Sequence, residues 1–383
     1  MTPFCRPAES HRRLAIYDAI VVGARCAGSP TAMLLARKGY RILLLDRSTF
    51  PSDIMSTHYI HPPGVARLER WGLLDKLRAS KCPPISKVTL HFGELIVTPP
   101  PPSGGPIETY CPRRTVLDKI LVDAAVDAGA ELLEGFSVRD IIMDGDRVTG
   151  IGGAGKSDST VTEQARIVIG ADGLHSIVAR HVRAPAYNTK PTFTFAYYTY
   201  WSGVPIKDAE LYFLDDAGML VFPTHDDLTC IAAGGPVEQF HEFRADIEGN
   251  YLRTIDRAPS LSERVHNGKR EERFVGTADQ PNFFRRPYGP GWALVGDAGY
   301  HRDLVTGLGI TDAFRDAELL AEAIDEGFSG RRRLDEALAD YERQRNELAM
   351  PLYEFTTQLA SGQEPTAQMF MEFGAAIQRM MPD

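Results

Sequence analysis

The chain has 383 residues, of which 43% are hydrophobic and 24% are charged. At roughly 150 residues per domain this suggests two or three domains with buried cores, and it excludes disorder over the whole length. The 51 acidic and 42 basic residues give a net charge of −9, so neither nucleic acid nor an anionic membrane is expected as the main partner. No run of about eighteen apolar residues exists, so we expect no membrane span.

Residues 1–16 carry three arginines but no apolar segment follows them, which predicts a disordered tail rather than a signal peptide. The five cysteines are scattered and include no C-x-x-C pair. This spacing indicates neither a disulfide framework nor a metal site, and it favours a reducing compartment, the cytoplasm.

The first predicted elements form a βαβ unit. An apolar strand over 18–22 is followed by a glycine-containing turn, a helix over 29–38 and a second apolar strand over 41–45 that ends at Asp46. The unit occupies about thirty positions, which is typical of a nucleotide-binding βαβ fold.

The turn of this unit reads Gly23-Ala-Arg-Cys-Ala-Gly28. A dinucleotide turn has the pattern G-x-G-x-x-G, because the backbone must approach a pyrophosphate at a helix N-terminus. Arg25 replaces the middle glycine, and Asp46 stands where a carboxylate would accept hydrogen bonds from a ribose. The alternative is an ordinary βαβ corner with a surface acid.

The next segments alternate between strands and one helix. A helix over 116–128 begins with a capping pattern, Thr115 and Asp118, and ends at Gly129. Residues 150–157 formally match G-x-x-x-x-G-K-[ST], but no amphipathic helix follows, so we interpret them as an exposed hairpin loop. The predicted strands are 87–92, 94–98, 131–133, 138–143, 147–151 and 166–170.

Residues 190–280 contain short aromatic-rich strands, which predict an antiparallel sheet inserted into the α/β domain. Tyr197, Tyr198, Tyr200 and Trp201 lie on one of these strands, so one face would pack into the core and the other would line an aromatic pocket. The α/β pattern then returns with a strand over 292–295, a helix over 311–328 and a helix over 334–350 that ends at Pro351. The strands predicted in the insert are 193–201, 210–213, 219–223 and 229–233.

Two further strands end in a glycine next to an aspartate. The strand before Asp172 ends in Gly-Ala-Asp-Gly, and the strand at 292–295 ends in Gly296-Asp297, followed by Gly307-Leu308-Gly309 at a helix start. Carboxylates at the carboxyl edge of a parallel sheet can hold a ligand, although each turn alone is unremarkable.

Together, in this order, the three turns resemble those of the single-component FAD-dependent aromatic monooxygenases, which have the p-hydroxybenzoate hydroxylase fold. The resemblance spans residues 17 to about 350. It implies an α/β fold with an α+β insert: a Rossmann-like FAD-binding domain (17–75, 105–185 and 281–330), an inserted antiparallel-sheet substrate domain (76–104 and 186–280) and C-terminal helices (331–383). It implies a cofactor site made of Gly23, Arg25, Gly28, Asp46, Arg47, Arg114, Asp172, Gly296, Asp297, Gly307, Leu308 and Gly309.

The chain departs from the family pattern near the expected flavin ring. Tyr300 stands where many members have histidine, Leu304 replaces a proline and Thr311 replaces an asparagine. By resemblance, His58, His61 and Tyr300 are candidates for contact with the substrate or the ring. The alternative for each histidine is a purely structural role.

The resemblance implies that NAD(P)H reduces FAD transiently, that oxygen adds to the reduced ring as a C4a-hydroperoxide, and that an aromatic or polyketide-like small molecule is hydroxylated. An FAD-dependent reductase of carbon–carbon double bonds, similar to geranylgeranyl reductases, is the alternative, as is a flavin-binding sensor without turnover. A flavin halogenase is disfavoured because the three tryptophans, at 71, 201 and 292, cannot form W-x-W-x-I-P. No metal is expected, and the sequence indicates no oligomeric state.

Overall fold

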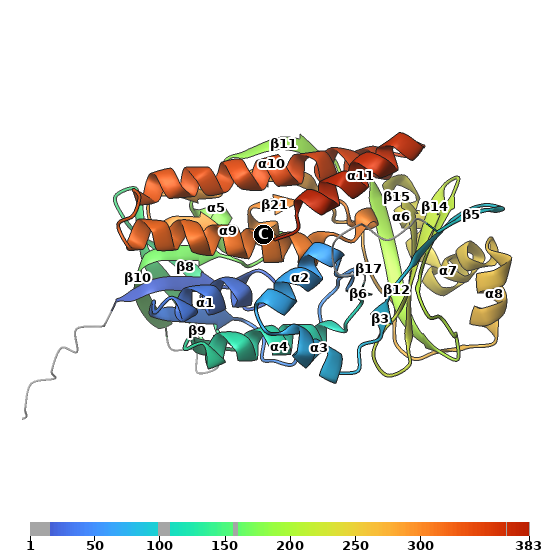
Figure 1. Cartoon of the computed structure of the whole chain (residues 1–383), viewed down its shortest axis with the longest axis horizontal. Helices are drawn as coiled ribbons and strands as arrows, with labels where there is room; N and C mark the ends of the chain where they lie inside the picture. Colours follow the sequence, from blue (N-terminus) through green and yellow to red (C-terminus); the bar gives the residue numbers. More distant parts are fainter. Residues whose placement is uncertain (1–15, 99–107, 156–159, 365, 383) are drawn as a thin grey trace, which may run out of the picture.

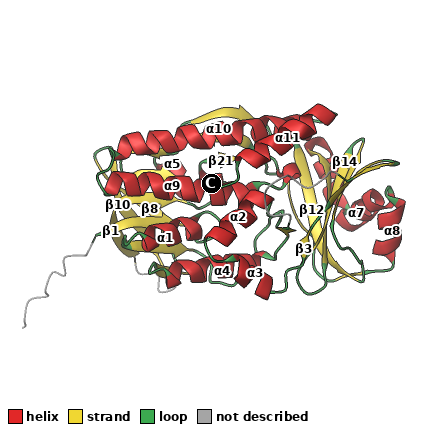
Figure 2. Cartoon of the chain, viewed as in Figure 1, coloured by secondary structure: helices red, strands yellow, loops and turns green. Residues whose placement is uncertain are grey.

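The computed structural model describes residues 16–98, 108–155, 160–364 and 366–382. Its two large sheets lie side by side, each covered by helices (Figures 1 and 2), and the described residues also form a three-stranded and a two-stranded sheet. The tail predicted for 1–16 lies outside the described residues except for Ile16, and so do residues 156–159 of the hairpin loop. None of the helices within the described ranges is both long and apolar enough to cross a membrane.

The first sheet follows the order β19-β20-β10-β1-β2-β7, and along this path every pair is parallel except β19 with β20. The hairpin of residues 137–154 adds to β10 in antiparallel orientation. Val22 pairs with Leu45 and Gly170, and Gly170 pairs with Leu294. Strands that are far apart in the sequence therefore end at the same edge of this sheet. The three glycine-containing turns, which follow β1, β10 and β20, lie together at that edge. The strands are β1 (Tyr17–Val22), β2 (Ile42–Asp46), β7 (Glu131–Glu134), β10 (Thr160–Gly170), β19 (Tyr288–Gly289) and β20 (Trp292–Leu294).

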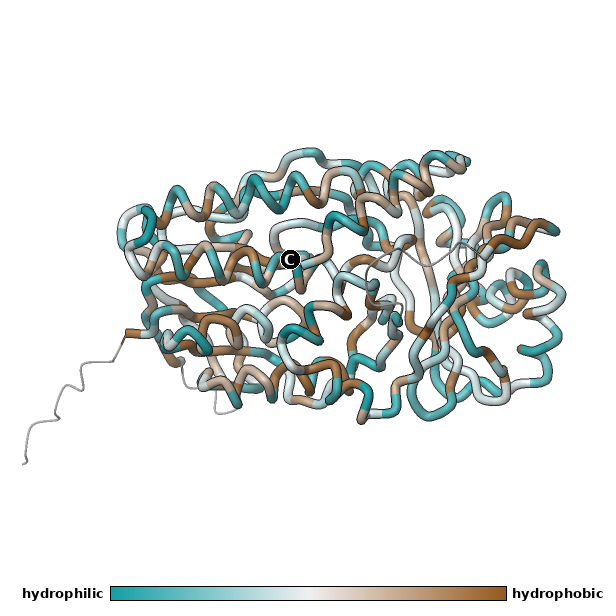
Figure 3. Tube along the Cα trace, viewed as in Figure 1, coloured by the Kyte–Doolittle hydropathy of each residue, from teal (hydrophilic) through white to brown (hydrophobic). Residues whose placement is uncertain are grey.

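Both faces of this sheet are covered, which explains its uniformly apolar strands. Ala19 and Val21 pack on one side against helices, whereas Ile20 and Val22 pack on the other against a hairpin and a short helix. In Figure 3 hydrophobic segments concentrate where the helices meet this sheet. The first layer contains α1 (Gly28–Arg37), α4 (Arg114–Asp127), α9 (Gly309–Phe328) and α10 (Leu334–Ala360), and the second contains β8 (Ser137–Asp144), β9 (Arg147–Ala154) and α5 (Ile177–His181).

The second sheet has the order β16-β12-β15-β14-β13-β4-β5, with β17 also on β12. It unites strands from 88–97 with strands from 194–277, and its pairs are antiparallel except β4 with β13. The strands are β4 (Val88–Phe92), β5 (Leu95–Val97), β12 (Thr194–Ser202), β13 (Ala209–Leu214), β14 (Ala217–Pro223), β15 (Thr229–Pro236), β16 (Lys269–Arg270) and β17 (Val275–Thr277).

Three helices that the strand pattern did not predict cover the outer face of the second sheet (Figure 2). Tyr197 and Trp201 of β12 pack against them, whereas Tyr198 and Tyr200 point to the opposite side with Cys230. The structure thereby decides which face of this strand is core. The helices are α6 (Phe240–Ala245), α7 (Ile247–Asp256) and α8 (Pro259–His266).

Two predicted helix ends are wrong. Helix α4 begins at Arg114, and its N-cap residue, Arg113, makes no side-chain hydrogen bond to the first turn. Thr115 and Asp118 lie inside the helix and therefore do not form a capping box. Helix α10 continues through Pro351 to Ala360. Pro351 has no N–H, so the backbone hydrogen bond to the carbonyl oxygen of Glu347, an exposed residue, is lost. Burial of residues on the following turn, such as Leu352, offsets this loss.

The remaining elements are short or peripheral. Residues 150–154 lie in β9, which pairs with β10, so the G-x-x-x-x-G-K-[ST] match opens no helix there. The other elements are α2 (Pro62–Arg70), α3 (Leu74–Ala79), β3 (Pro84–Ile85), β6 (Thr109–Tyr110), β11 (Ala186–Lys190), β18 (Asn282–Arg285), β21 (Tyr300–His301) and α11 (Ala367–Arg379), with 3-10 turns at Val237–Gln239, Gly296–Ala298 and Leu304–Thr306.

Candidate functional site

A cavity of about 730 Å³ extends from the carboxyl edge of the first sheet to the inner face of the second. Its first part is formed by the three turns, and its last part by β12, β14 and β15. The predicted site residues that line it are Gly23, Arg25, Asp46, Arg47, Arg114, Asp172, Asp297, Tyr300, Gly307, Leu308 and Gly309. The predicted site residues outside its lining are Gly28, Gly296, His58 and His61.

The turn after β1 is built by glycines that no other residue can replace. Gly23 has φ +104°, and a Cβ there would lie 2.4 Å from the carbonyl oxygen of Ala171. A Cβ at Gly28 would lie only 1.7 Å from the carbonyl oxygen of Gly23. The first turn of α1 therefore closes directly on the strand end, which leaves its N-terminal end beside the cavity. Gly28 shapes this turn without lining the cavity itself.

Asp46 is fixed at the end of β2 by the backbone around it. Its Oδ2 accepts a hydrogen bond from the Ala24 N–H at 2.8 Å, and its Oδ1 accepts one from the Ser48 N–H at 2.8 Å. Each oxygen keeps a second lone pair for a ligand. The neighbouring Arg47 is exposed and also lines the cavity, so it supplies a positive charge at this end.

Two arginines share one buried carboxylate behind the first turn. Arg25 donates to Asp118 Oδ2 at 2.6 Å, and Arg114 donates to Asp118 Oδ1 at 2.9 and 3.1 Å. Asp118 is fully buried, so it is a counterion rather than the helix cap that the sequence predicted. The three side chains carry a net charge of +1 beside the turn, which favours an anionic ligand.

Asp172 and Asp297 follow the other two strand ends. Asp172 Oδ2 accepts from the Ile177 N–H at 2.6 Å, whereas Oδ1 is buried without a partner among the residues the structure describes. Burial raises the pKa of Asp172. Asp297 is exposed to the cavity, although its neighbours Gly296 and Ala298 are buried. Enclosure by the surrounding protein raises the pKa of Asp297, and His301 partly offsets this increase.

The start of α9 forms another part of the lining. Gly307 has φ +62°, and a Cβ added at Gly309 would meet no protein atom within 4 Å. The N-cap residue, Leu308, provides no side-chain cap. The first N–H groups of this twenty-residue helix are therefore available to a ligand, together with the positive end of its dipole.

The two candidate histidines lie behind the cavity wall. His58 is buried, its Nε2 is 2.9 Å from the Tyr200 hydroxyl, and burial lowers its pKa to about 3, with Arg114 and Arg113 lowering it further. His61 Nε2 is 2.9 Å from the Thr306 carbonyl oxygen, and burial lowers its pKa to about 4. Both are neutral at pH 7, so neither supplies a cation at the cavity.

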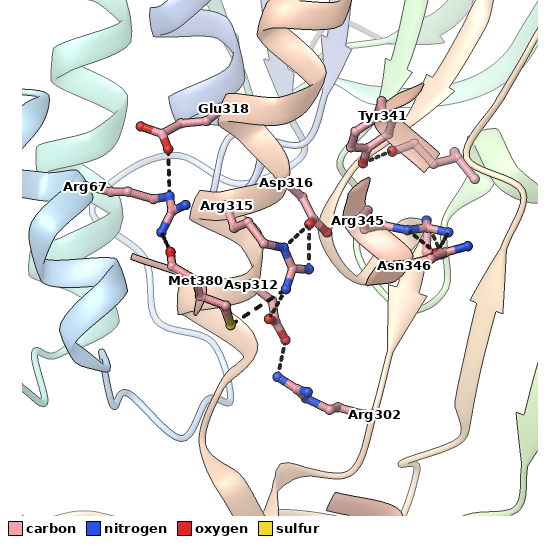
Figure 4. Close-up of polar contacts among 12 residues, drawn as sticks. Arg67, Arg302, Asp312, Arg315, Asp316, Glu318, Tyr341, Arg345, Asn346 and Met380 are labelled. Carbon is pink, nitrogen blue, oxygen red and sulfur yellow. Dashed lines mark hydrogen bonds and ion pairs between the residues drawn. The ribbon is translucent and has the colours of Figure 1, made fainter. Parts of the chain in front are cut away.

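The sequence analysis did not predict a group of buried charges at Arg302, Asp312, Arg315 and Asp316 (Figure 4). The Tyr300 ring centroid lies 5.5 Å from the guanidinium carbon of Arg302 and 6.0 Å from that of Arg315. Arg302 donates to Asp312 Oδ2 at 2.5 Å, and Arg315 donates to Asp312 Oδ1 at 2.8 Å and to Asp316 at 2.6 Å. Arg302 and Asp312 also line the cavity. The only signal in the sequence was a set of charged residues around the start of an otherwise apolar helix.

The end of the cavity at the second sheet is mainly apolar. Its side chains fit a flat hydrophobic molecule better than a charged one, because few of them can hydrogen-bond. They are Ala196, Tyr198, Leu220, Phe222, Cys230, Ala232 and Thr277.

Comparison with known proteins gives a consistent result. A family profile described as FAD binding domain matches residues 16–356. The chain is 30% identical to digeranylgeranylglycerophospholipid reductase 2 of Methanopyrus kandleri, over 81% of this chain and 78% of the relative. It is 24% identical to tryptophan 2-halogenase of Chondromyces crocatus, over 85% of this chain and 64% of the relative.

Solved structures share the fold. The myxobacterial chondrochloren halogenase CndH superposes with a TM-score of 0.83 at 22% identity, covering 95% of this chain and 90% of that one. PqsL of Pseudomonas aeruginosa, described as a probable FAD-dependent monooxygenase, superposes with a TM-score of 0.78 at 19% identity, covering 95% of this chain and all of that one. At these identities the likeness establishes the architecture alone.

Proposed function

The chain belongs to the FAD binding domain family of flavin-dependent oxidoreductases, and we propose that it is a monooxygenase of a small aromatic or polyketide-like molecule. The observation that carries the proposal is a continuous cavity that joins the three turns to the apolar face of the second sheet. A cofactor held at the turns would present its reactive end to a substrate lying on that face.

The residues present fit FAD in two independent ways. The unpartnered Oδ1 of Asp172 is a buried acceptor that a ligand hydroxyl would satisfy. The absence of protein around a Cβ at Gly309 leaves room for a flat ring against the start of α9. When bound, FAD supplies the redox chemistry, accepting reducing equivalents from NAD(P)H and passing them to oxygen.

We assign the residues as follows. The turn from Gly23 to Gly28 and the N-terminus of α1 hold the diphosphate, with Arg25 and Arg114 adding positive charge. Asp46 and Arg47 hold the adenosine end, and Asp172 and Asp297 bind hydroxyl groups of the connecting chain. The start of α9 at Gly307–Gly309 orients the ring and stabilises its negative charge in the reduced state.

The substrate would lie against the side chains of β12, β14 and β15. Tyr198 and Phe222 offer aromatic surfaces for stacking, and the buried setting excludes water from the reacting groups. We propose the domain division given above, with 76–104 and 186–280 as the substrate domain. Cys26, Cys82, Cys111 and Cys230 are free thiols, in keeping with a cytoplasmic protein.

The test begins with the absorption spectrum of the purified protein, which should show bound flavin or gain it on incubation with FAD. A library of phenols and aromatic ketones is then screened for substrate-dependent NAD(P)H oxidation coupled to oxygen uptake. The product should be heavier by one oxygen atom. A colourless protein that cannot be loaded with FAD would refute the proposal.

One observation favours a second function, reduction of carbon–carbon double bonds. The 30% identity to a digeranylgeranylglycerophospholipid reductase extends over most of both chains. The apolar end of the cavity would equally accept part of an isoprenoid chain. In this case the reduced protein should consume an alkene without oxygen, and the product should gain two hydrogen atoms.

A further inference from the structure

Arg302 is a buried cation whose hydrogen-bonding capacity is only partly used. Its side chain is 4% exposed and Nη2 donates to Asp312, but Nε and Nη1 find no acceptor in the part of the chain that the structure describes. Guanidinium nitrogens are strong donors, and a buried donor without an acceptor is destabilising. Because Arg302 lines the cavity, a ligand can supply the missing acceptor.

Tyr300, which also lines the cavity, presents a second unused donor on a ring next to Arg302. Its hydroxyl is buried without a partner within the described ranges, and its ring centroid lies 5.5 Å from the Arg302 guanidinium carbon. The ring is held by Phe284 at 4.5 Å and by Tyr353 at 6.2 Å between centroids. Burial raises the pKa of Tyr300, so its hydroxyl keeps its proton for donation at neutral pH.

Among the residues described, the neighbouring ion pairs occupy only Nη2 of Arg302, and Asp297 of the cavity lining acts on Arg302 electrostatically without a hydrogen bond to it. Asp312 is shared with Arg315, which also binds Asp316, so the four side chains sum to zero charge before any ligand binds. All of the acidic partners lie on α9, as Figure 4 shows, and Arg302 is the member at the end of this chain of ion pairs.

We propose that Arg302 and Tyr300 form an oxyanion subsite of the cavity, which binds a delocalised negative oxygen on a planar group. Arginine is suited to this chemistry because its planar donors match carboxylate-like oxygens. Two sources have this chemistry: the pyrimidine carbonyl of the reduced flavin and a carboxylate of the substrate. The first source rests on the proposed function, whereas the second requires only the cavity.

Two substitutions isolate the subsite. Arg302→Met removes the charge but keeps the apolar stem, and it leaves Asp312 paired with Arg315 at 2.8 Å. Arg302→Lys keeps the charge. Tyr300→Phe removes only the hydroxyl, and its matched control is Tyr353→Phe, which packs in the same aromatic cluster, donates to the Asn188 carbonyl and does not line the cavity.

Two probes distinguish the sources. Sulfite adds to the oxidised flavin ring through a new sulfur–nitrogen bond and leaves one negative charge on the pyrimidine half, so its dissociation constant, read from flavin absorbance, reports the first source. Benzoate, titrated by calorimetry, reports the second. We expect Arg302→Met to raise the dissociation constant of one of the two probes, sulfite or benzoate, at least about tenfold, because a charged hydrogen bond is lost. Arg302→Lys should recover part of the loss, and Tyr353→Phe should match wild type.

The outcomes are separable from those of the proposed function. Unchanged affinities for both probes in Arg302→Met with FAD bound would overturn the subsite, and so would a wild type that responds to neither probe. If wild type fails to hold FAD, the proposed function fails, but benzoate titration of the protein still decides on the subsite. Circular dichroism of each variant verifies that a loss of binding is not a loss of fold.

Discussion

Asp118 gives the most decisive test of how the site is built. The carboxylate is fully buried and accepts hydrogen bonds from Arg25 at 2.6 Å and from Arg114 at 2.9 Å, with the Cys26 thiol at 3.4 Å. In Asp118→Asn the charge is lost and the new amide N–H groups face guanidinium donors. Removing one partner of a buried ion pair costs about 3–5 kcal/mol. If Asp118 were only a capping residue, the loss would be about 1 kcal/mol.

The assay is urea unfolding followed by circular dichroism, with and without FAD. The control is Asp123→Asn on the same helix, because the pair of Asp123 with Lys119 is half exposed and is worth about 0.5 kcal/mol or less. We expect a large loss of unfolding free energy and weaker FAD binding only in Asp118→Asn. Equal, small effects of both substitutions would refute the view that this carboxylate organises the arginines.

Three other substitutions test separate parts of the structure. Gly28→Ala should abolish FAD binding, measured by fluorescence titration, because the new Cβ would lie 1.7 Å from the carbonyl oxygen of Gly23. The control is Gly374→Ala, whose Cβ would meet no atom within 4 Å and which should bind FAD like wild type. Gly309→Leu should keep the unfolding free energy and lose FAD affinity, since the side chain enters the cavity; retained affinity would contradict the ring position. His58 has a pKa of about 3 in the folded protein against about 6.5 unfolded, so its stabilising contribution is complete above pH 6.5 and is lost as pH falls toward 3. Between pH 6.5 and 5 the lost free energy of unfolding amounts to about 2 kcal/mol. Asparagine tolerates the positive φ of position 58, so we expect His58→Asn to fold and its stability to urea to depend correspondingly less on pH. An unchanged pH dependence would exclude His58 as its source.

The resemblance and the cofactor turns were predictable from sequence because they depend on local spacing. Gly23 and Gly28 are required by backbone contacts within one βαβ unit, so their pattern is readable without the rest of the chain. The family and fold class expected from the three turns are confirmed by the family profile and by the shared architecture of solved structures. Roles of individual site residues stay predictions.

Other features depended on partners distant in sequence. Asp118 matches a capping pattern locally, yet Arg25, 93 positions away, makes it a counterion. Pro351 ends a helix by propensity, yet packing of the following turn carries α10 to Ala360. In both cases the energy of a tertiary contact exceeds a local preference of about 1–3 kcal/mol.

The sequence by itself determined the cofactor class, because the turns that recognise a dinucleotide are short and have strict steric requirements. Only the tertiary structure decided which side chains line the cavity. It placed Tyr198 on the cavity side of β12 and His58 and His61 behind the cavity wall. It also left Nε and Nη1 of Arg302 without acceptors among the described residues. The physical reason is that burial and unsatisfied hydrogen bonds are properties of the assembled chain, which no local pattern contains.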